Sequence, residues 1–134
     1  MAQPIVIAVT NQKGGVGKTT TSINLSYSLA QAGKNVLLVD FDPQGNATSG
    51  LGIDNLEKTI LDVLRNSVPL SAVTVSTAYK NLSLVPATPE LANAEVELAR
   101  AEKRCTRLKD ALAGYDGYDI IVIDSPPSLS LLTV

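Results

Sequence analysis

Residues 11–20, NQKGGVGKTT, place three glycines, two lysines and two threonines within ten positions. Glycines allow successive backbone N–H groups to turn inward around phosphate oxygens, and a helix that starts here adds its positive N-terminal dipole. Lys18 is placed to contact β- and γ-phosphates, Thr19 to offer Mg²⁺ its hydroxyl, and Thr20 to contact the α-phosphate. The segment therefore predicts a nucleotide-binding loop made of Lys13, Gly14, Gly15, Val16, Gly17, Lys18, Thr19 and Thr20.

Two aspartates stand on either side of Phe41 in the segment VDFDPQGN. If the chain stays extended there, the carboxylates of Asp40 and Asp42 project to the same side. At the carboxyl end of a parallel strand they are expected to open toward the phosphate loop, because ligands collect at that edge of α/β sheets. A carboxylate is then the available group to position an attacking water. The alternative is a pair of aspartates that cap the loop before Pro43.

A third motif, IIVIDSPPS, is an apolar run that ends on Asp124. A single carboxylate in this position can hold Mg²⁺, often through water. Pro126 and Pro127 are expected to stiffen the loop that follows. An apolar strand that ends in aspartate is common by itself, so the motif gains its meaning from coming third, after the phosphate loop and the paired aspartates.

The elements that must position these residues form an α/β pattern. Short, continuous β-branched runs predict parallel strands covered on both faces at Ile5–Val9, Val36–Val39 and Ile120–Ile123, with a further strand at Leu82–Pro86. Helices are predicted over residues 19–32 with Gly33 as the C-cap, over Thr59–Arg65 and over Pro89–Leu112. Residues 67–81 carry no clear pattern. The expected fold is a P-loop NTPase-like, three-layer, doubly wound and mostly parallel sheet flanked by helices.

The composition excludes several other chemistries. The chain of 134 residues has no histidine and one cysteine, so it offers no Ser-His-Asp triad, Cys-His dyad, histidine-ligated metal or internal disulfide. Cys105 falls on the apolar face of the long predicted helix and is interpreted as a core residue. A net charge of −2 does not favour bulk attraction to nucleic acid. No apolar run approaches the length of a membrane span and the N-terminus has no basic region, so a cytoplasmic location is expected.

The three ordered motifs, KGGVGKTT, VDFDPQGN and IIVIDSPPS, resemble those of the deviant Walker A ATPases. Within that family, VDFDPQGN is similar to the motif of the ParA/Soj-type chromosome and plasmid partition ATPases. Gln12 stands where the standard Walker A motif has glycine, and the extra Lys13 marks the variant. The resemblance implies ATP and Mg²⁺ as cofactors. It implies that Lys13 reaches the partner's ATP across a dimer, that Asp42 orients the attacking water, and that Asp40 supports the Mg²⁺ environment together with Asp124.

The resemblance also implies a function: slow Mg-ATP hydrolysis coupled to homodimerisation and to binding of nonspecific DNA. A centromere-binding partition protein is expected to stimulate hydrolysis, with the ATPase nucleoid-associated in a prokaryote and no role for a membrane. Family members are longer, so residues 1–134 are expected to be the N-terminal part of a single ATPase domain, truncated at its C-terminus.

Other functions remain open at this stage. One is a nucleotide-binding fragment without turnover. Another is a membrane-associated ATPase similar to septum-site regulators, which DPQGN disfavours, and an electron-transfer relative of nitrogenase iron protein would need more cysteines than Cys105. A basic stripe on the long predicted helix suits DNA phosphates or an acidic partner, or is an ordinary solvated face; it consists of Arg100, Lys103, Arg104 and Arg107.

Overall fold

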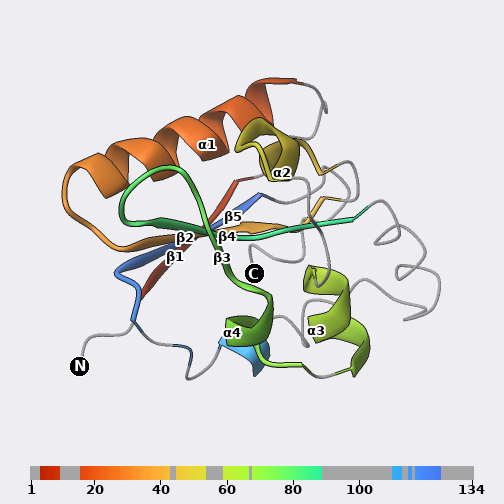
Figure 1. Ribbon diagram of the computed structural model, residues 1–134. Helices are drawn as coiled ribbons and strands as arrows, with labels where there is room; N and C mark the ends of the chain where they lie inside the picture. The colour runs from red at the N-terminus through yellow and green to blue at the C-terminus, as the bar shows by residue number, and fades with distance from the viewer. Residues whose placement is uncertain are drawn as a thin grey trace.

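The computed structural model describes residues 4–9, 16–42, 45–53, 59–66, 68–88, 110–112, 115 and 117–124, with the side chains of 16–19 and 64–66 left aside. Within these ranges one sheet contains five strands (Figure 1): β1 (Ile5–Val9), β2 (Val36–Asp40), β3 (Val75–Ser76), β4 (Leu82–Val85) and β5 (Ile120–Asp124). The strands predicted from apolar runs are confirmed, with ends that differ by no more than one residue.

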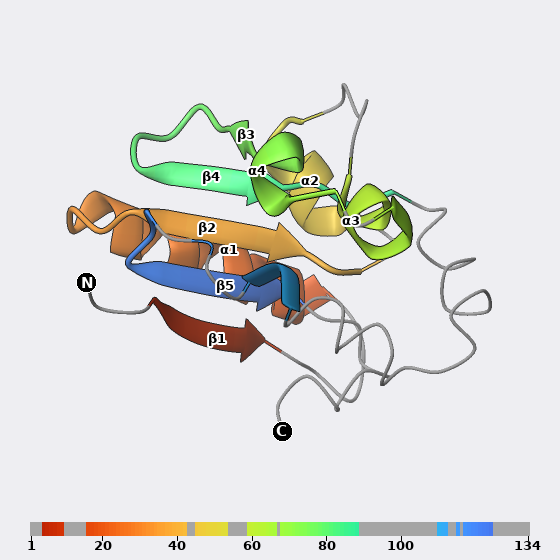
Figure 2. The same ribbon diagram turned by 90° about the horizontal axis from the view of Figure 1, so that it is seen from below.

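The order of the strands across the sheet is β1-β5-β2-β4-β3 (Figure 2). β1, β5, β2 and β4 run parallel, whereas the short β3 pairs antiparallel with β4. The last of the described strands, β5, therefore lies between the first two. The mostly parallel sheet that the sequence predicts is confirmed.

Helices cover both faces of this sheet (Figure 1). One face carries α1 (Val16–Gln31) and α2 (Asn46–Gly50), and the opposite face carries α3 (Ile60–Asn66) and α4 (Leu70–Val73). The predicted three-layer, doubly wound architecture is therefore confirmed. No helix in the described ranges is long and apolar enough to cross a membrane.

Alternation along β2 divides the core into two halves. Val36 and Leu38 pack with residues of α1 and α2, whereas Leu37 and Val39 pack with residues of α3 and α4. All residues of β2 and β5 are buried, as expected for strands covered on both faces. The same expectation is wrong for the start of β1, where Ile5 is 63% and Val6 is 50% exposed. In the described sheet β1 is an edge strand, with a neighbour on one side only.

The face of α1 that meets the sheet is lined by small residues. Ser22, Ser26 and Ala30 recur every fourth position and are almost fully buried. Small side chains let the helix backbone approach the sheet closely. The larger Tyr27 points outward and packs edge-on against Tyr79, with 5.0 Å between the ring centroids.

Gly33 ends α1 as the sequence predicts. Its φ of 94° lies in the left-handed region. The Gly33 N–H donates to the carbonyl of Ala30 and the Lys34 N–H to that of Leu29, which satisfies carbonyls at the helix end.

Replacing Gly33 with alanine is expected to lower the free energy of unfolding by about 1 kcal/mol, because a Cβ disfavours positive φ. A steric clash does not contribute to this loss of stability, since a Cβ at position 33 would meet nothing within 4 Å. Urea unfolding of the wild type, Gly33→Ala and Gly33→Asn measures the effect. Asparagine tolerates this conformation better, so it should lose less; equal losses for both variants would contradict the explanation.

The remaining predictions agree in part. The short helix predicted at Thr59–Arg65 lies at Ile60–Asn66, and the unassigned stretch contains α4, β3 and a turn. The sequence analysis missed α2. Of the long helix predicted at Pro89–Leu112, the structure describes only residues 110–112, which are helical.

Candidate functional site

A row of residues crosses the carboxyl edge of the sheet. Val9 of β1 is in register with Asp124 of β5, and Asp124 is in register with Asp40 of β2. Both aspartates are the last residues of their strands and both are fully buried. The structure thus brings together two of the predicted site residues from segments 84 positions apart in the chain.

The start of α1 lies at the same edge. Ser22 donates a hydrogen bond of 3.1 Å from its hydroxyl to Oδ1 of Asp124. Lys18 precedes Ser22 by four residues, about one turn of the same helix. The backbone of residues 16–20 is helical. This placement suits a phosphate loop between β1 and α1.

Several predicted residues fall outside the described part of the chain. Lys13, Gly14 and Gly15 lie wholly outside it. For residues 16–19 only the backbone is described, so the side chains of Val16, Lys18 and Thr19 are left aside. Thr20 is described, and it is exposed on α1. The basic stripe and the cysteine also lie outside the described ranges: Arg100, Lys103, Arg104, Cys105 and Arg107. Their predicted roles stay predictions.

Three donors among the described residues hold the carboxylate of Asp40. Its Oδ2 accepts the backbone N–H of Thr48 at 2.9 Å and the Thr48 hydroxyl at 2.6 Å, and its Oδ1 accepts the N–H of Asp42 at 3.3 Å. The N-cap of α2 is Gly45, which makes no side-chain cap. Asp40 therefore supplies from β2 the acceptor, and the negative charge, that the start of a helix favours.

Burial still leaves the Asp40 charge costly. Loss of solvent raises the pKa of Asp40 to about 6, the charge of Asp124 also acts to raise it, and the hydrogen bonds from Thr48 and Asp42 act in the opposite direction. A cation bound between the two buried carboxylates would offset the cost of their negative charge, so the pair suits a cation site. The described residues contain no group of three or more metal-ligating side chains. Mg²⁺ commonly takes one or two carboxylates together with phosphate oxygens and water, so the pair is a sufficient protein contribution.

The Asp40 pKa predicts a pH-dependent stability in the absence of metal. The carboxyl has a pKa of about 6 in the folded chain against 3.8 ordinarily, so the folded state binds its proton more tightly. The contribution of Asp40 to the free energy of unfolding is therefore fully present below pH 4. It decreases by on the order of 3 kcal/mol as the pH rises through 6. Asp40→Asn cannot ionise.

Urea unfolding in EDTA, at several values between pH 4 and 7, should therefore show the wild type losing stability relative to Asp40→Asn as the pH rises. Comparing the two chains cancels the titration of all groups that do not interact with Asp40. Parallel profiles for the two chains would contradict the raised pKa.

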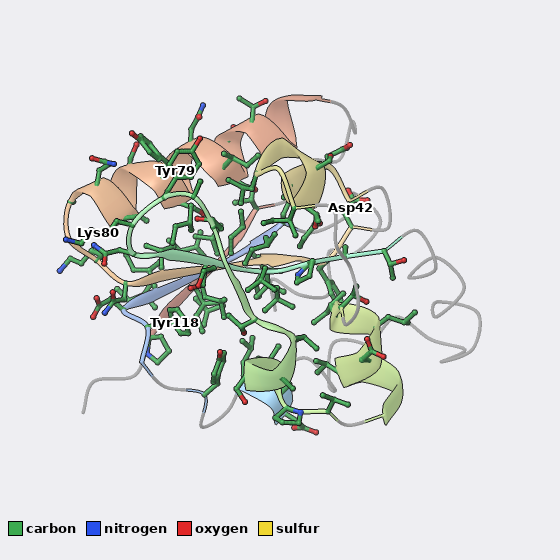
Figure 3. The ribbon with its side chains drawn as sticks, in the orientation of Figure 1. Asp42, Tyr79, Lys80 and Tyr118 are labelled. Atoms are coloured by element: carbon green, nitrogen blue, oxygen red, sulfur yellow. The ribbon has the colours of Figure 1, made fainter. Side chains whose placement is uncertain are left out.

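Asp42 lies at the same edge but not in the strand. β2 ends at Asp40, and the N–H of Phe41 donates to the carbonyl of Asp124. Phe41 is fully buried in the same core cluster as Leu37 and Val39, so the alternation of β2 continues as far as Phe41. The shared direction of the Asp40 and Asp42 carboxylates stays a prediction. The N–H of Gly45 closes the turn by donating to the carbonyl of Asp42, which is 7% exposed. Figure 3 shows Asp42 at the end of the sheet opposite Tyr79 and Tyr118.

A family model described as an AAA domain matches residues 5–134, almost the whole chain. The chain belongs to this AAA-domain family. The match includes the phosphate loop, both aspartate motifs and every described strand, so the family assignment covers the complete candidate site.

Similar proteins narrow the comparison within the AAA-domain family. The chain is 54% identical over 132 residues to the sporulation initiation inhibitor protein Soj of Bacillus subtilis, covering 96% of this chain and 52% of Soj. It is also 54% identical to the chromosome partitioning protein ParA of Myxococcus xanthus, covering 96% of this chain and 47% of that protein. The predicted resemblance to ParA/Soj-type partition ATPases is therefore confirmed. The chain spans about half the length of the curated relatives it matches.

A solved structure with the same fold contains a nucleotide. Cobyrinic acid a,c-diamide synthase from Mycobacterium smegmatis with bound ADP and magnesium superposes with a TM-score of 0.87 at 47% identity, covering 98% of this chain and 54% of that one. This agreement supports the fold assignment independently of the family model.

Sequence reasoning missed two residues at the site, Ser22 and Thr48. The spacing in the sequence could have indicated Ser22, because this polar residue comes one helical turn after Lys18. Thr48 gave no such signal. It lies in a helix of one turn, and its contact with Asp40 depends on how α2 folds back over the end of β2.

Proposed function

We propose that this chain is the nucleotide-binding part of a partition ATPase that binds and hydrolyses Mg-ATP. The observation that carries the proposal is the in-register pair of buried aspartates at the strand ends, with Asp124 bonded to α1 directly after the phosphate-loop motif. Both carboxylates lie at the edge of the sheet where β1 ends and α1 begins, which is the edge where P-loop proteins bind and hydrolyse nucleotides. The ADP and magnesium in the similar solved structure support ATP and Mg²⁺ as the cofactors.

The residues divide the work as follows. Lys18 and the backbone N–H groups of residues 14–20 bind the phosphates, and Thr19, Asp40 and Asp124 hold Mg²⁺ directly or through water. The chemistry that the metal supplies is neutralisation of charge on the β- and γ-phosphates. Asp42 positions the attacking water.

We further propose that ATP binding leads to a homodimer in which Lys13 contacts the partner's nucleotide. The dimer binds nonspecific DNA, and a centromere-binding partner protein stimulates hydrolysis and release. The name of the ParA relative, a chromosome partitioning protein, supports a role in partition. Location in the cytoplasm, on the nucleoid, follows from it.

The test is a set of three measurements on the chain of 134 residues: Mg-ATP affinity by calorimetry, phosphate release, and binding of a nonspecific DNA duplex with Mg-ATP or Mg-ADP. Mg-ATP binding together with phosphate release supports the ATPase proposal. DNA binding in Mg-ATP but not in Mg-ADP supports the partition cycle. Binding without turnover would favour a nucleotide-binding module instead. No Mg-ATP binding would overturn the proposal.

A further inference from the structure

The hydroxyl of Thr48 joins three separate segments of the chain. It donates to Oδ2 of Asp40 at the end of β2 and accepts the backbone N–H of Ala87 at 3.0 Å. Thr48 itself belongs to α2 and is 3% exposed. Its one hydroxyl thus uses its proton and a lone pair in a buried place where water cannot replace either bond.

On the first side, the connection leads to Asp42. Asp40 accepts the Thr48 hydroxyl on one carboxylate oxygen and the N–H of Asp42 on the other. The planar carboxylate couples these two bonds, because rotation that breaks one displaces the other. The orientation of Asp40, and with it the start of the turn that carries Asp42, therefore depends on Thr48.

On the second side, the connection leads to α3. Ala87 follows Pro86, whose carbonyl accepts the N–H of Ile60 at 2.8 Å, at the first residue of α3. Ala87 is 1% exposed and packs in the core beneath α3 and α4. A shift of the Asp42 turn would therefore displace Thr48 and Ala87, and with them the start of α3 on the other face of the sheet.

We propose that Thr48 is a positioning residue for hydrolysis: its hydroxyl holds the Asp40 carboxylate so that the Asp42 turn keeps its geometry, and it ties that turn to the segment after β4. This inference rests on the proposed function, because it assumes that Asp42 positions the attacking water. Thr48 touches neither nucleotide nor water in the reaction. It acts through Asp40.

Thr48→Val tests the role of the hydroxyl, because valine keeps the shape and the backbone N–H bond to Asp40. We expect a fall in the hydrolysis rate at saturating Mg-ATP of about 10- to 100-fold, the effect of misplacing a reacting group. Mg-ATP affinity should change less than the rate, although Asp40 is also assigned to the Mg²⁺ environment. Thr48→Ser keeps the hydroxyl and should recover most of the rate. In an Asp42→Ala background, Thr48→Val should cause no further loss, since both changes remove the same function.

Thr77 provides a matched control at the opposite edge of the sheet. Its hydroxyl donates to the carbonyl of Leu82 and accepts the N–H of Tyr79, so Thr77→Val also removes one donor and one acceptor. It should leave hydrolysis unchanged. A wild-type rate in Thr48→Val, or an equal loss in Thr77→Val, would overturn the proposal.

Amide hydrogen exchange separates this proposal from the proposed function. In Thr48→Val the amides of Asp42 and Ala87 should exchange faster than in wild type, and in Thr48→Ser they should return to the wild-type rate. If the wild-type chain does not hydrolyse ATP, the catalytic proposal fails, and these amides still decide whether Thr48 holds the turn. Unchanged exchange at both amides would overturn the inference whatever the ATPase activity.

Discussion

Asp42→Ala is expected to retain Mg-ATP and to lower its hydrolysis by at least about 100-fold, the usual contribution of a group that handles the proton of the attacking water. Asp42 comes just after the end of β2 and is almost fully buried, so its carboxylate is confined by the fold. Alanine removes the carboxylate and leaves the phosphate loop untouched. Affinity should therefore stay within a few-fold of wild type while phosphate release stops.

If turnover limits the lifetime of the ATP-bound dimer, the same variant should accumulate dimers. Sedimentation in Mg-ATP and in Mg-ADP measures this directly. A dimer with ATP alone would mean that the dimer interface lies within these residues, and a nucleotide-bound monomer would assign that interface to a longer chain. Asp119→Ala, which removes an exposed aspartate at the opposite end of β5, is the control. Wild-type hydrolysis in Asp42→Ala would exclude Asp42 as the water-positioning residue.

Lys18→Ala is expected to weaken Mg-ATP binding by at least about 30-fold. The lysine is assigned the main cationic contact to the β- and γ-phosphates, and loss of one partner of a buried charged contact costs about 2–5 kcal/mol. Affinity for Mg-ADP should fall less, because the contact to the γ-phosphate is absent there. Calorimetric titration with both nucleotides measures the difference.

Lys34 offers a matched control for the charge. It follows the C-cap of α1, at the far end of the helix from Lys18, and is exposed. Lys34→Ala makes the same change in net charge and should bind Mg-ATP like wild type. Equal affinity in Lys18→Ala and wild type would show that residues 13–20 are not the phosphate-binding loop.

The family and the core strands were accessible from local sequence. Runs such as Val36–Val39 and Ile120–Ile123 predict buried parallel strands because a strand covered on both faces must be apolar at every position. Gly33 predicts the end of α1 because it tolerates positive φ. The phosphate-loop motif is a prediction of the same local kind, since the role assigned to its glycines and Lys18 follows from their chemistry and spacing.

The environment of each carboxylate could not be predicted from local sequence in the same way. Alternation predicts that Asp40 and Asp42 project together, but it gives no sign that the N–H of Asp42 donates to the Asp40 carboxylate. The site of Asp40 is completed by Thr48, from a one-turn helix too short to give a periodic pattern. Local pattern identifies residue types; it does not identify the partners that later segments bring.

By itself, then, the sequence determined the resemblance to ParA/Soj-type partition ATPases, the parallel strands, the phosphate-loop motif and the three candidate aspartates. The tertiary structure alone decided that β5 inserts between β1 and β2, which places Asp124 in register with Asp40. It also decided that the Thr48 hydroxyl binds Asp40 on one side and the N–H of Ala87 on the other. The physical reason is that strand order and long-range hydrogen bonds are selected by the packing of the whole sheet and its helices, whereas local patterns record only the burial and backbone preferences of each segment.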